Sequence, residues 1–438
     1  MTARGGPART SFPWGTVLGV GLAMTVLAMV LWNIISHFAG DTALNPDPTS
    51  IPATGVVATP QPTQASATPV DIATPEDTDS SPWEAGSLPS LLKVAPDLLA
   101  DGSLPLNDIA RYSNVAGWME SLGIPVPGSP EEAAGGPWEE ALEDLALPAS
   151  LREFGLDPRW KQTYGFDLTE VAQVLVVGQA PDVVLLIRGN FDEDALMASW
   201  VASGYQPIEV ERETVWTLAP GDGIDLSAPE SRLSLGTLNN LVVLEDGTLA
   251  ASSRLSRLGA VLRVEHGEDA ALADNPSIAP LLVQGSGIDE LDSVVISRGT
   301  LLQAPPGTNV PVGTPLTDSF VATPSAANED PLVPVMGQVA VVLTGVGPVT
   351  EGVVPFTLRL VLEDEDDTEE TAAMVAQRLR TGVSAVDGRA WSEVLGAVEV
   401  AAGEGVVIVE AEHPPATLGW LQLVSDHDFG FAAWQAEP

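Results

Sequence analysis

The chain has 438 residues, 45% of them hydrophobic, and its 60 acidic and 18 basic side chains give a formal charge of −42. This balance excludes nucleic acid as a partner, because phosphate binding needs a basic patch. The absence of cysteine excludes disulfides, thiol catalysis and cysteine zinc sites. The length predicts two or three folding units, and an acidic, lysine-poor surface suits a salty medium, where screening relieves repulsion.

The N-terminus contains a predicted membrane anchor. Residues 1–13 form a short basic segment with Arg4 and Arg9, and Trp14 to Ser36 carries no charge. As a helix this apolar stretch is about 34 Å long, which spans the hydrocarbon core of a bilayer. No basic residue follows until Lys93. The positive-inside rule therefore predicts a single-pass protein of the cell membrane, with residues 1–13 in the cytoplasm and the rest outside.

A cleaved signal peptide is the alternative interpretation of this segment. A signal peptide has a shorter apolar region and small residues before its cleavage site. Here the apolar run is longer, and His37 and Phe38 stand where small residues are needed. The sequence therefore favours an uncleaved signal anchor whose first partner is the lipid bilayer.

The predicted anchor also carries small residues at a spacing of four, at Gly15, Gly19 and Ala23. This spacing is typical of helix pairs in membranes and indicates a weak homodimer. Glycine and alanine are also common in membrane helices without pairing, so the alternative is that these residues have no role in association.

Residues 37–82 are predicted to be a flexible stalk. The segment from Asp41 to Pro82 contains eight prolines and eight threonines, as in ATPQPTQASATP. It cannot bury enough apolar surface to fold, and its prolines keep it extended. Its composition resembles that of O-glycosylated stalks. The segment is interpreted as a spacer between the membrane and the outer domain.

Residues 83–165 are predicted to be a mainly helical lead-in segment. The stretch DIARYSNVAGWMESLG, Asp108 to Gly123, places apolar side chains near helical spacing, and Gly123 can end the helix. The stretch PWEEALEDLALP begins with Pro137, which suits the first turn of a helix, and two glutamates follow near the positive helix end. It is therefore interpreted as a capped helix rather than an acidic active site.

Residues 166–302 are predicted to form a first α+β lobe. The run AQVLVVGQAPDVVLLIRG, Ala172 to Gly189, indicates two strands around a turn. FDEDALMASWVASGY indicates an amphipathic helix that ends at Gly204, and the alternation over Gln206 to Leu218 indicates a hairpin. LNNLVVLEDGTLAASSRLSRLGAVL adds strands joined by Asp-Gly and a helix from about Ser253.

Residues 336–438 are predicted to form a second α+β lobe. Gly337 to Gly345 and Pro355 to Asp364 indicate two strands, and DTEETAAMVAQRLRTG indicates a helix. A hairpin is predicted around Gly403 to Gly405, followed by a closing helix in PATLGWLQLV. Both lobes thus have the order strand, strand, helix, strand, strand, helix. They are interpreted as structural repeats or as two lobes of one α+β domain, joined by a Pro-rich loop over 303–335.

The most acidic stretch of the chain, Glu363 to Glu370, lies between a predicted strand and a predicted helix. Seven of its eight residues are acidic. Asp367 or Thr368 can cap the helix, and acids favour the positive helix end. The alternative is a calcium loop, but an EF-hand needs a glycine after its third ligand position, and none follows Asp366. The stretch is therefore interpreted as the start of a helix.

Few residues of the chain suggest catalysis. Its histidines are His37, His266, His413 and His427. His427 lies between Asp426 and Asp428, a trio that could bind a metal or orient a base, but the other ligands of a zinc site are lacking. Ser286 lies directly between two glycines, which is the wrong spacing for a nucleophile elbow. No catalytic, cofactor-binding or metal-ligating residue is therefore predicted, and most of the tryptophans are expected to pack in the core.

Three functions are compatible with this layout. The leading hypothesis is a membrane-anchored extracytoplasmic surface domain, not an enzyme, that binds an unidentified membrane or cell-wall protein or has a structural or sensory role. The first alternative is a hydrolase of wall polymer or glycan that uses paired carboxylates. The second alternative is a module that binds a small ligand or a divalent cation.

Overall fold

The chain divides into two compact units, Met1–Glu76 and Asp77–Pro438, and the computed structural model describes parts of the second. The described residues are 87–99, 108–179, 182–219, 229–283, 287–304, 338–384, 388–413, 420–425, 430–432 and 434–435. The predicted cytoplasmic segment, membrane helix and stalk lie outside these residues, as does nearly all of the predicted loop over 303–335. None of the helices within the described stretches has the length and apolarity needed to span a bilayer.

The fold is a mixed α+β fold with one large antiparallel sheet, which confirms the predicted class. The strands of this sheet are β1 (Asp108–Asn114), β2 (Val171–Gln179), β3 (Asp182–Gly189), β4 (Gln206–Val210), β5 (Glu213–Thr217), β6 (Asn240–Val243), β7 (Leu249–Ser252), β8 (Ser293–Arg298), β10 (Val339–Val346), β11 (Val354–Leu362), β12 (Ala397–Ala402) and β13 (Val406–His413). A separate parallel pair is formed by β9 (Gln303–Ala304) and β14 (Trp434–Gln435).

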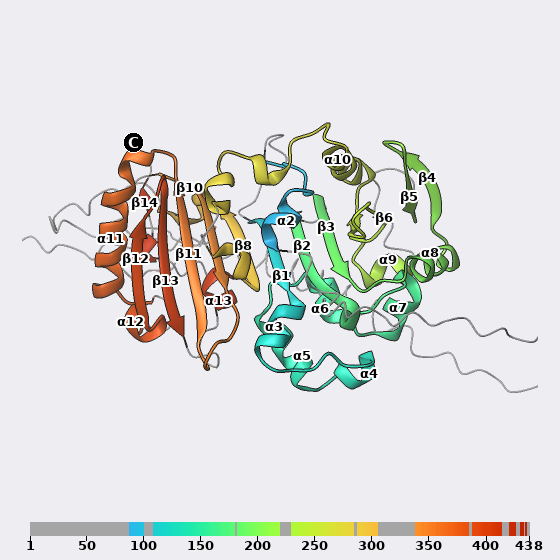
Figure 1. The fold of residues 1–438 in the computed structure, drawn as a ribbon, viewed down its shortest axis with the longest axis horizontal. Helices are drawn as coiled ribbons and strands as arrows, with labels where there is room; N and C mark the ends of the chain where they lie inside the picture. The colour runs from blue at the N-terminus through green and yellow to red at the C-terminus, as the bar shows by residue number, and fades with distance from the viewer. Residues whose placement is uncertain are drawn as a thin grey trace, which may run out of the picture. The chain divides into compact units, whose positions relative to one another are not determined.

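The sheet has the strand order β12-β13-β11-β10-β8-β1-β2-β3-β7-β6-β5-β4 (Figure 1). The two strands β1 and β8 lie side by side at its centre and pair antiparallel. Outward from β1 come β2, β3, β7 and β6, and outward from β8 come β10, β11, β13 and β12. We call β1 to β7 the first half of the sheet, and β8 with β10 to β13 the second half.

Helices surround this sheet. They are α2 (Leu88–Leu92), α3 (Val115–Ser121), α4 (Pro130–Ala133), α5 (Pro137–Ala141), α6 (Ala149–Phe154), α7 (Pro158–Tyr164), α8 (Glu193–Ala202), α9 (Pro229–Leu233), α10 (Leu255–Glu265), α11 (Thr368–Thr381), α12 (Trp391–Val394) and α13 (Trp420–Ser425). Several short 3-10 turns join them, including η4 (Ala279–Leu282), η5 (Ile288–Glu290) and η7 (Glu365–Asp367).

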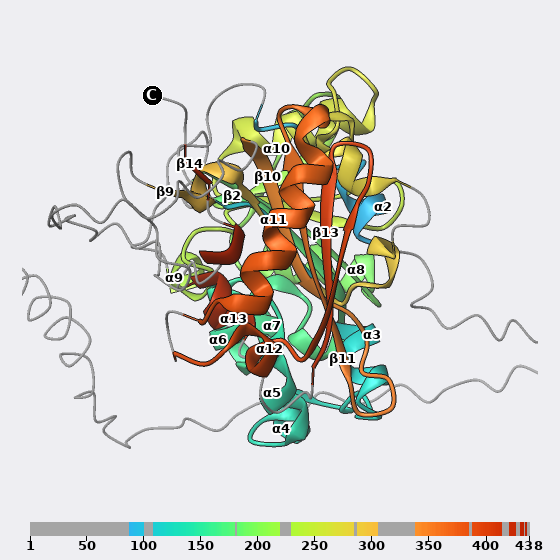
Figure 2. The same cartoon turned by 90° about the vertical axis from the view of Figure 1, so that its left-hand side faces the viewer.

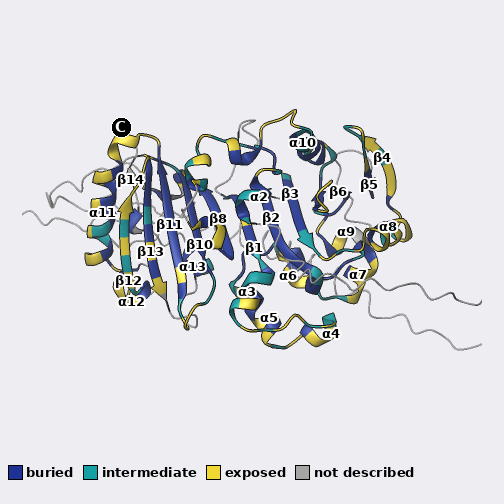
Figure 3. Ribbon diagram, in the orientation of Figure 1, coloured by how far each residue is buried: buried dark blue, intermediate teal, exposed yellow. Residues whose placement is uncertain are grey.

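Hydrophobic core lies on both faces of the central strands, which are buried along most of their length (Figure 3). In β2, Val174 and Val176 belong to one core cluster, and Leu175 and Val177 belong to the other. Strands buried on both faces are continuous apolar runs rich in β-branched residues, because β-branched side chains pack well on a pleated surface. The sequence of β2, VAQVLVVGQ, has this character.

The helices that follow the last strand of each half, α10 and α13, pack on opposite faces of the sheet. The apolar side chains of α10 pack into one cluster together with those of α2. The apolar side chains of α11, α12 and α13 pack into the other cluster, and Figure 2 shows α11 beside β13 of the second half. The sheet face on which α10 packs is therefore, in the second half, the face opposite α11, α12 and α13.

The prediction of a helix over Asp108 to Gly123 is wrong for its first part. Asp108–Asn114 is strand β1, and α3 begins only at Val115. As a central strand β1 is buried on both faces, so its apolar residues do not alternate. The spacing of Ile109, Tyr112 and Val115 then imitates a helix. The Asn114 side chain ends the strand, because its oxygen accepts a hydrogen bond from the Gly117 amide and caps α3.

Other sequence predictions are confirmed. A helix begins at Pro137, and α8 is capped by Asp192, whose carboxylate accepts a hydrogen bond from the Ala195 amide. The predicted hairpins correspond to β2-β3, β4-β5 and β12-β13. The closing helix is described as α13, which begins at Trp420. Strand β8 has no counterpart among the predictions.

Candidate functional site

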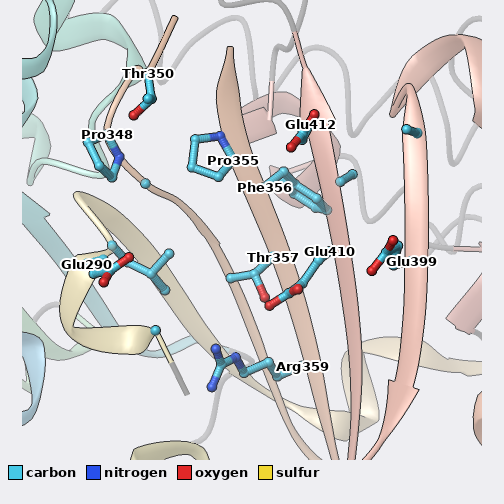
Figure 4. A pocket seen from close by; sticks show the side chains of 15 residues that line it. Glu290, Pro348, Thr350, Pro355, Phe356, Thr357, Arg359, Glu399, Glu410 and Glu412 are labelled. Atoms are coloured by element: carbon cyan, nitrogen blue, oxygen red, sulfur yellow. The ribbon is translucent and has the colours of Figure 1, made fainter. Parts of the chain in front are cut away.

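The candidate site is a hollow on the second half of the sheet, on the face opposite α11 (Figure 4). Its volume is about 500 Å³, and strands β11, β12 and β13 form its floor. The residues after β10 and the η5 turn form its rim. Four glutamates line it, and all four are exposed: Glu290, Glu399, Glu410 and Glu412. We call these four residues the acidic face.

Strand register brings the acidic face together. Glu399 of β12 lies directly opposite Glu410 of β13, and Ala397 lies opposite Glu412. Glu410 in turn lies opposite Thr357 of β11. Cross-strand neighbours have Cβ atoms about 4.5–5.5 Å apart, and like charges in such positions are destabilising. The acidic face therefore costs folding stability, which is a physical reason to connect it with binding.

A buried arginine lies at the base of the hollow. Arg359 is 2% exposed, and its Nη1 donates a hydrogen bond of 3.5 Å to the Leu281 carbonyl oxygen. Burial lowers the pKa of Arg359 from its usual value, and the Glu410 carboxylate acts in the opposite direction. With one arginine and four glutamates, the lining has an excess of negative charge. It suits a cationic ligand rather than an anion.

One polar group of the floor is left without a partner. Thr357 is 5% exposed, and its hydroxyl has no hydrogen-bond partner. In Figure 4 this side chain lies beside that of Glu410. A buried hydroxyl without a partner costs free energy. A hydrogen-bonding group of a ligand in the hollow would supply the missing interaction.

The glutamates of the acidic face are spread over η5 and two strands. Among the described residues there is no group of three or more His, Asp or Glu side chains that could hold a metal ion. Carboxylates distributed along a sheet face can each meet a different positive group. This arrangement fits a cation that extends over several strand positions.

The acidic stretch from Glu363 to Glu370 lies at the start of a helix, as predicted, but the capping residue differs. The Asp364 carboxylate accepts a hydrogen bond from the Asp366 amide and caps η7. Asp367 makes no side-chain cap to α11, and the Thr368 hydroxyl donates to the Glu365 carbonyl oxygen. The prediction of a cap by Asp367 or Thr368 is therefore wrong, because a 3-10 turn precedes the helix.

The histidines do not meet in the described structure. His266 follows α10, and its Nε2 lies 3.5 Å from the Glu213 carboxylate. His413 ends β13 on a different part of the sheet. His37 and His427, with Asp426 and Asp428, lie outside the described residues, as does Ser286. Gly15, Gly19 and Ala23 of the predicted helix pair also lie outside them.

The prediction that tryptophans pack in the core is confirmed for most of those described. The buried ones are Trp118, Trp138, Trp160, Trp200, Trp391 and Trp420. Three of them donate their indole N–H to backbone carbonyl oxygens: Trp118 to Ala141, Trp200 to Tyr164 and Trp420 to Asp144. Core packing therefore accounts for them without a ligand.

Sequence reasoning missed the acidic face. Its signal is present in VEVAAGEGVVIVEAE, where glutamates alternate with valine and alanine on both strands of a predicted hairpin. Period-two alternation places Glu399, Glu410 and Glu412 on the polar face of the hairpin. The contributions of Glu290 and Arg359 need the register between strands that are distant in sequence, and that register has no local signal.

A second polar cluster lies next to the rim of the hollow, where β1 ends and β8 begins. Asp292 is 3% exposed; its Oδ1 accepts a hydrogen bond of 2.8 Å from Asn114 Nδ2, and its Oδ2 has no partner. Burial raises the pKa of Asp292 to about 7, the Asn114 hydrogen bond opposes this, and the charge of Glu120 adds to it. Burial therefore favours the protonated form of this carboxyl group more than in an exposed aspartate.

Comparison of the chain with known protein families, with curated proteins and with solved structures found no match.

Proposed function

We propose that this protein is a membrane-anchored extracytoplasmic protein whose folded part binds a cationic partner through the acidic face. The observation that carries the proposal is the exposed row of glutamates over a hollow of about 500 Å³. Repulsion between Glu399 and Glu410 opposes folding, and a positive partner removes this cost when it binds. The described part of the chain thus supports the partner-binding hypothesis more than the hydrolase hypothesis.

The anchoring part of the proposal rests on the sequence. Residues 14–36 are uncharged and long enough to span a bilayer, and the basic residues precede them. In this proposal residues 37–82 are a stalk that holds the folded part away from the membrane. The basic segment of a wall or membrane protein on the outer side is then the natural class of partner.

The proposal also includes two structural repeats. The first runs from β1 through β2, β3, α8, β6 and β7 to α10, with β4, β5 and α9 inserted. The second runs from β8 through β10, β11, α11, β12 and β13 to α13. The equivalent strand order on either side of the β1-β8 pair supports this duplication. The helix after the last strand packs on opposite faces in the two repeats, and this difference leaves the acidic face open in the second.

Crosslinking of the full-length protein in its native membrane, followed by capture and mass spectrometry, tests the partner-binding function. The test variant is the double substitution Glu410→Lys and Glu412→Lys, and the matched control is Glu209→Lys. Glu209 is an exposed glutamate on β4, at the other end of the sheet. We expect the wild type and the control to capture the same partner in stoichiometric amount, and the double variant to lose it.

Equal capture by all three proteins would contradict the proposal, as would the absence of any stoichiometric partner. A melting temperature of the double variant equal to or above that of the wild type would show that loss of capture is not caused by unfolding. We expect a melting temperature close to that of the wild type, because the substitutions remove the repulsion with Glu399 and also remove the carboxylate that offsets the burial of Arg359.

A small organic cation is a second candidate ligand, and the volume of the hollow favours it. Small-molecule sites have volumes of about 300–1,000 Å³. A polyamine such as spermine would then raise the melting temperature of the wild type and of Glu209→Lys, but not that of the double variant. Equal stabilisation of all three proteins would indicate general attraction to an acidic surface.

A further inference from the structure

Strand β12 ends the sheet within the described part of the chain, and its outer edge is an edge of the sheet. All six of its residues are exposed or half-buried (Figure 3). Every second residue of an edge strand turns its backbone N–H and C=O groups outward, and these groups are a template for another strand.

Hollows of opposite chemistry lie on the two faces of β12. On one face Ala397 and Glu399 line the hollow of the acidic face. On the other face Val398 and Val400 line a groove of about 320 Å³ between β12 and α11. The remaining lining of this groove is mainly apolar or small, with one arginine, Arg380. A strand added to β12 would point alternate side chains into these two hollows.

We propose that an extended segment of a partner protein adds to β12 as a further strand, with basic side chains over the acidic face and apolar side chains in the groove. This inference rests on the proposed function and specifies the form of the partner. In β-strand addition, main-chain hydrogen bonds provide affinity, and pockets for alternate side chains provide specificity. An alternating basic and apolar segment matches both faces of β12.

Charge complementarity identifies the occupant. A lysine on the added strand, placed opposite Glu399, would be a cross-strand neighbour of that glutamate. Glu410 lies opposite Glu399 on β13, so the lysine would face both carboxylates. The same residues disfavour a second copy of this chain, because antiparallel pairing of two β12 edges would bring their glutamates together. The charge of −42 on each chain adds to that repulsion.

The floor of the hollow gives an independent indication of a ligand. The Thr357 hydroxyl is buried, has no hydrogen-bond partner and lies beside the Glu410 side chain (Figure 4). A lysine ammonium group that reaches Glu410 has three donors. One of them can bond the carboxylate and another can bond this hydroxyl.

Binding of peptide probes to the purified full-length protein tests the inference. The probe is a short capped fluorescent peptide in which lysine and valine alternate, and its control has the same composition with all lysines first. We expect the alternating peptide to bind at least about tenfold more tightly at physiological salt. Glu399→Lys and Ser392→Trp, which fills the groove, should each weaken binding about tenfold, and Glu209→Lys should leave it unchanged.

Two N-methylated forms of the alternating peptide test the strand geometry, one methylated on every lysine amide and the other on every valine amide. In a strand these two sets of amides point to opposite edges. We expect one form to lose binding and the other to retain it. Equal behaviour of the two forms would overturn strand addition.

The remaining outcomes separate this inference from the proposed function. Equal binding of the alternating and the segregated peptide, or no binding of either, would overturn the inference. If crosslinking still captures a partner through Glu410 and Glu412 in that case, the acidic face binds its partner without an added strand. If capture is also independent of these glutamates, both the function and the inference are wrong.

Discussion

At the scale of single residues, the molecule combines buried groups that titrate with exposed groups that repel. Asp292 has one carboxylate oxygen on Asn114 and one without a partner, in the seam between the two central strands. Glu399 and Glu410 lie opposite each other in solvent. The first arrangement makes folding stability depend on pH, and the second makes it depend on salt and on bound cations.

Asp292 should make the protein more stable in mild acid than at alkaline pH. Its folded-state pKa of about 7 lies above the usual value of 3.8. The folded state therefore holds this proton more tightly than the unfolded state, and stability falls as pH rises between these two values. We expect Asp292→Asn to raise the free energy of unfolding at pH 8 by about 1–4 kcal/mol, and to change it little at pH 4. A higher urea midpoint at pH 8 measures this gain.

The matched control for this experiment is Glu120→Gln, which removes the nearby charge that contributes to the raised pKa. We expect a smaller stabilisation at pH 8 from this variant, because burial is the main cause of the shift. A urea midpoint of Asp292→Asn that is lower than that of the wild type at pH 8 would contradict a carboxyl group whose pKa is raised by burial.

Neutralising either Glu399 or Glu410 should increase the folding stability of the protein. Glu399→Gln removes the like-charge contact and keeps the shape of the side chain, so we expect stabilisation of about 0.2–1 kcal/mol at low salt. The gain should shrink in molar salt because screening already weakens the repulsion. Thermal unfolding of the variant and the wild type at both salt concentrations measures this. A destabilised variant at low salt would show that the pair is not repulsive.

At the scale of elements, helices α7 and α8 pack closely because a glycine lies between them. Gly165 ends α7 with a φ of +84°, and a Cβ added there would lie 2.6 Å from the Leu196 Cα of α8. Gly204 ends α8 with a φ of +89°, and nothing lies within 4 Å of an added Cβ. Both glycines need a left-handed backbone conformation, but only Gly165 also needs the absence of a side chain because α8 lies so close.

This difference predicts unequal costs of the same substitution. Gly204→Ala pays only for the left-handed backbone, about 1–2 kcal/mol. Gly165→Ala also drives a methyl group into the backbone of α8, so we expect it to cost at least about 2 kcal/mol more. Equal losses of unfolding free energy in denaturant titrations would show that α8 does not pack against Gly165 as described.

Element prediction from the sequence succeeded where local patterns decide the structure. The hairpins β4-β5 and β12-β13 alternate and turn at short loops, so period and turn residues predicted them. It failed for β1, because the spacing of Ile109, Tyr112 and Val115 imitates a helix, and it did not predict β8. Local alternation in β12-β13 carries a signal for three glutamates of the acidic face, but the positions of Glu290 and Arg359 beside them depend on contacts between distant segments, which local patterns do not encode.

At the scale of the whole molecule, charge and topology act together. A charge of −42 on 438 residues opposes compaction. Part of that charge lies on the acidic face, on the second half of the sheet. The helices α11, α12 and α13 pack on the opposite face and do not cover it. A protein of this kind should be stabilised by any condition that screens or neutralises carboxylates.

The melting temperature should therefore rise between low and molar salt. We expect sodium chloride to raise it steadily at pH 7, because screening weakens the mutual repulsion of exposed carboxylates. Differential scanning fluorimetry of the full-length protein in a salt series measures the rise. The melting temperature of the double variant Glu410→Lys and Glu412→Lys should rise less steeply with salt concentration. A flat melting temperature across the series would count against charge repulsion as a main destabilising force.

The most direct test of the account is site-specific photo-crosslinking in intact cells, with a photoreactive amino acid in place of Glu412 and, in a second protein, in place of Glu209. We expect one adduct of defined mass from position 412, containing a basic partner segment, and no such adduct from position 209. Adducts of the same mass from both positions, or none from position 412, would contradict the claim that the acidic face is where this protein binds its partner.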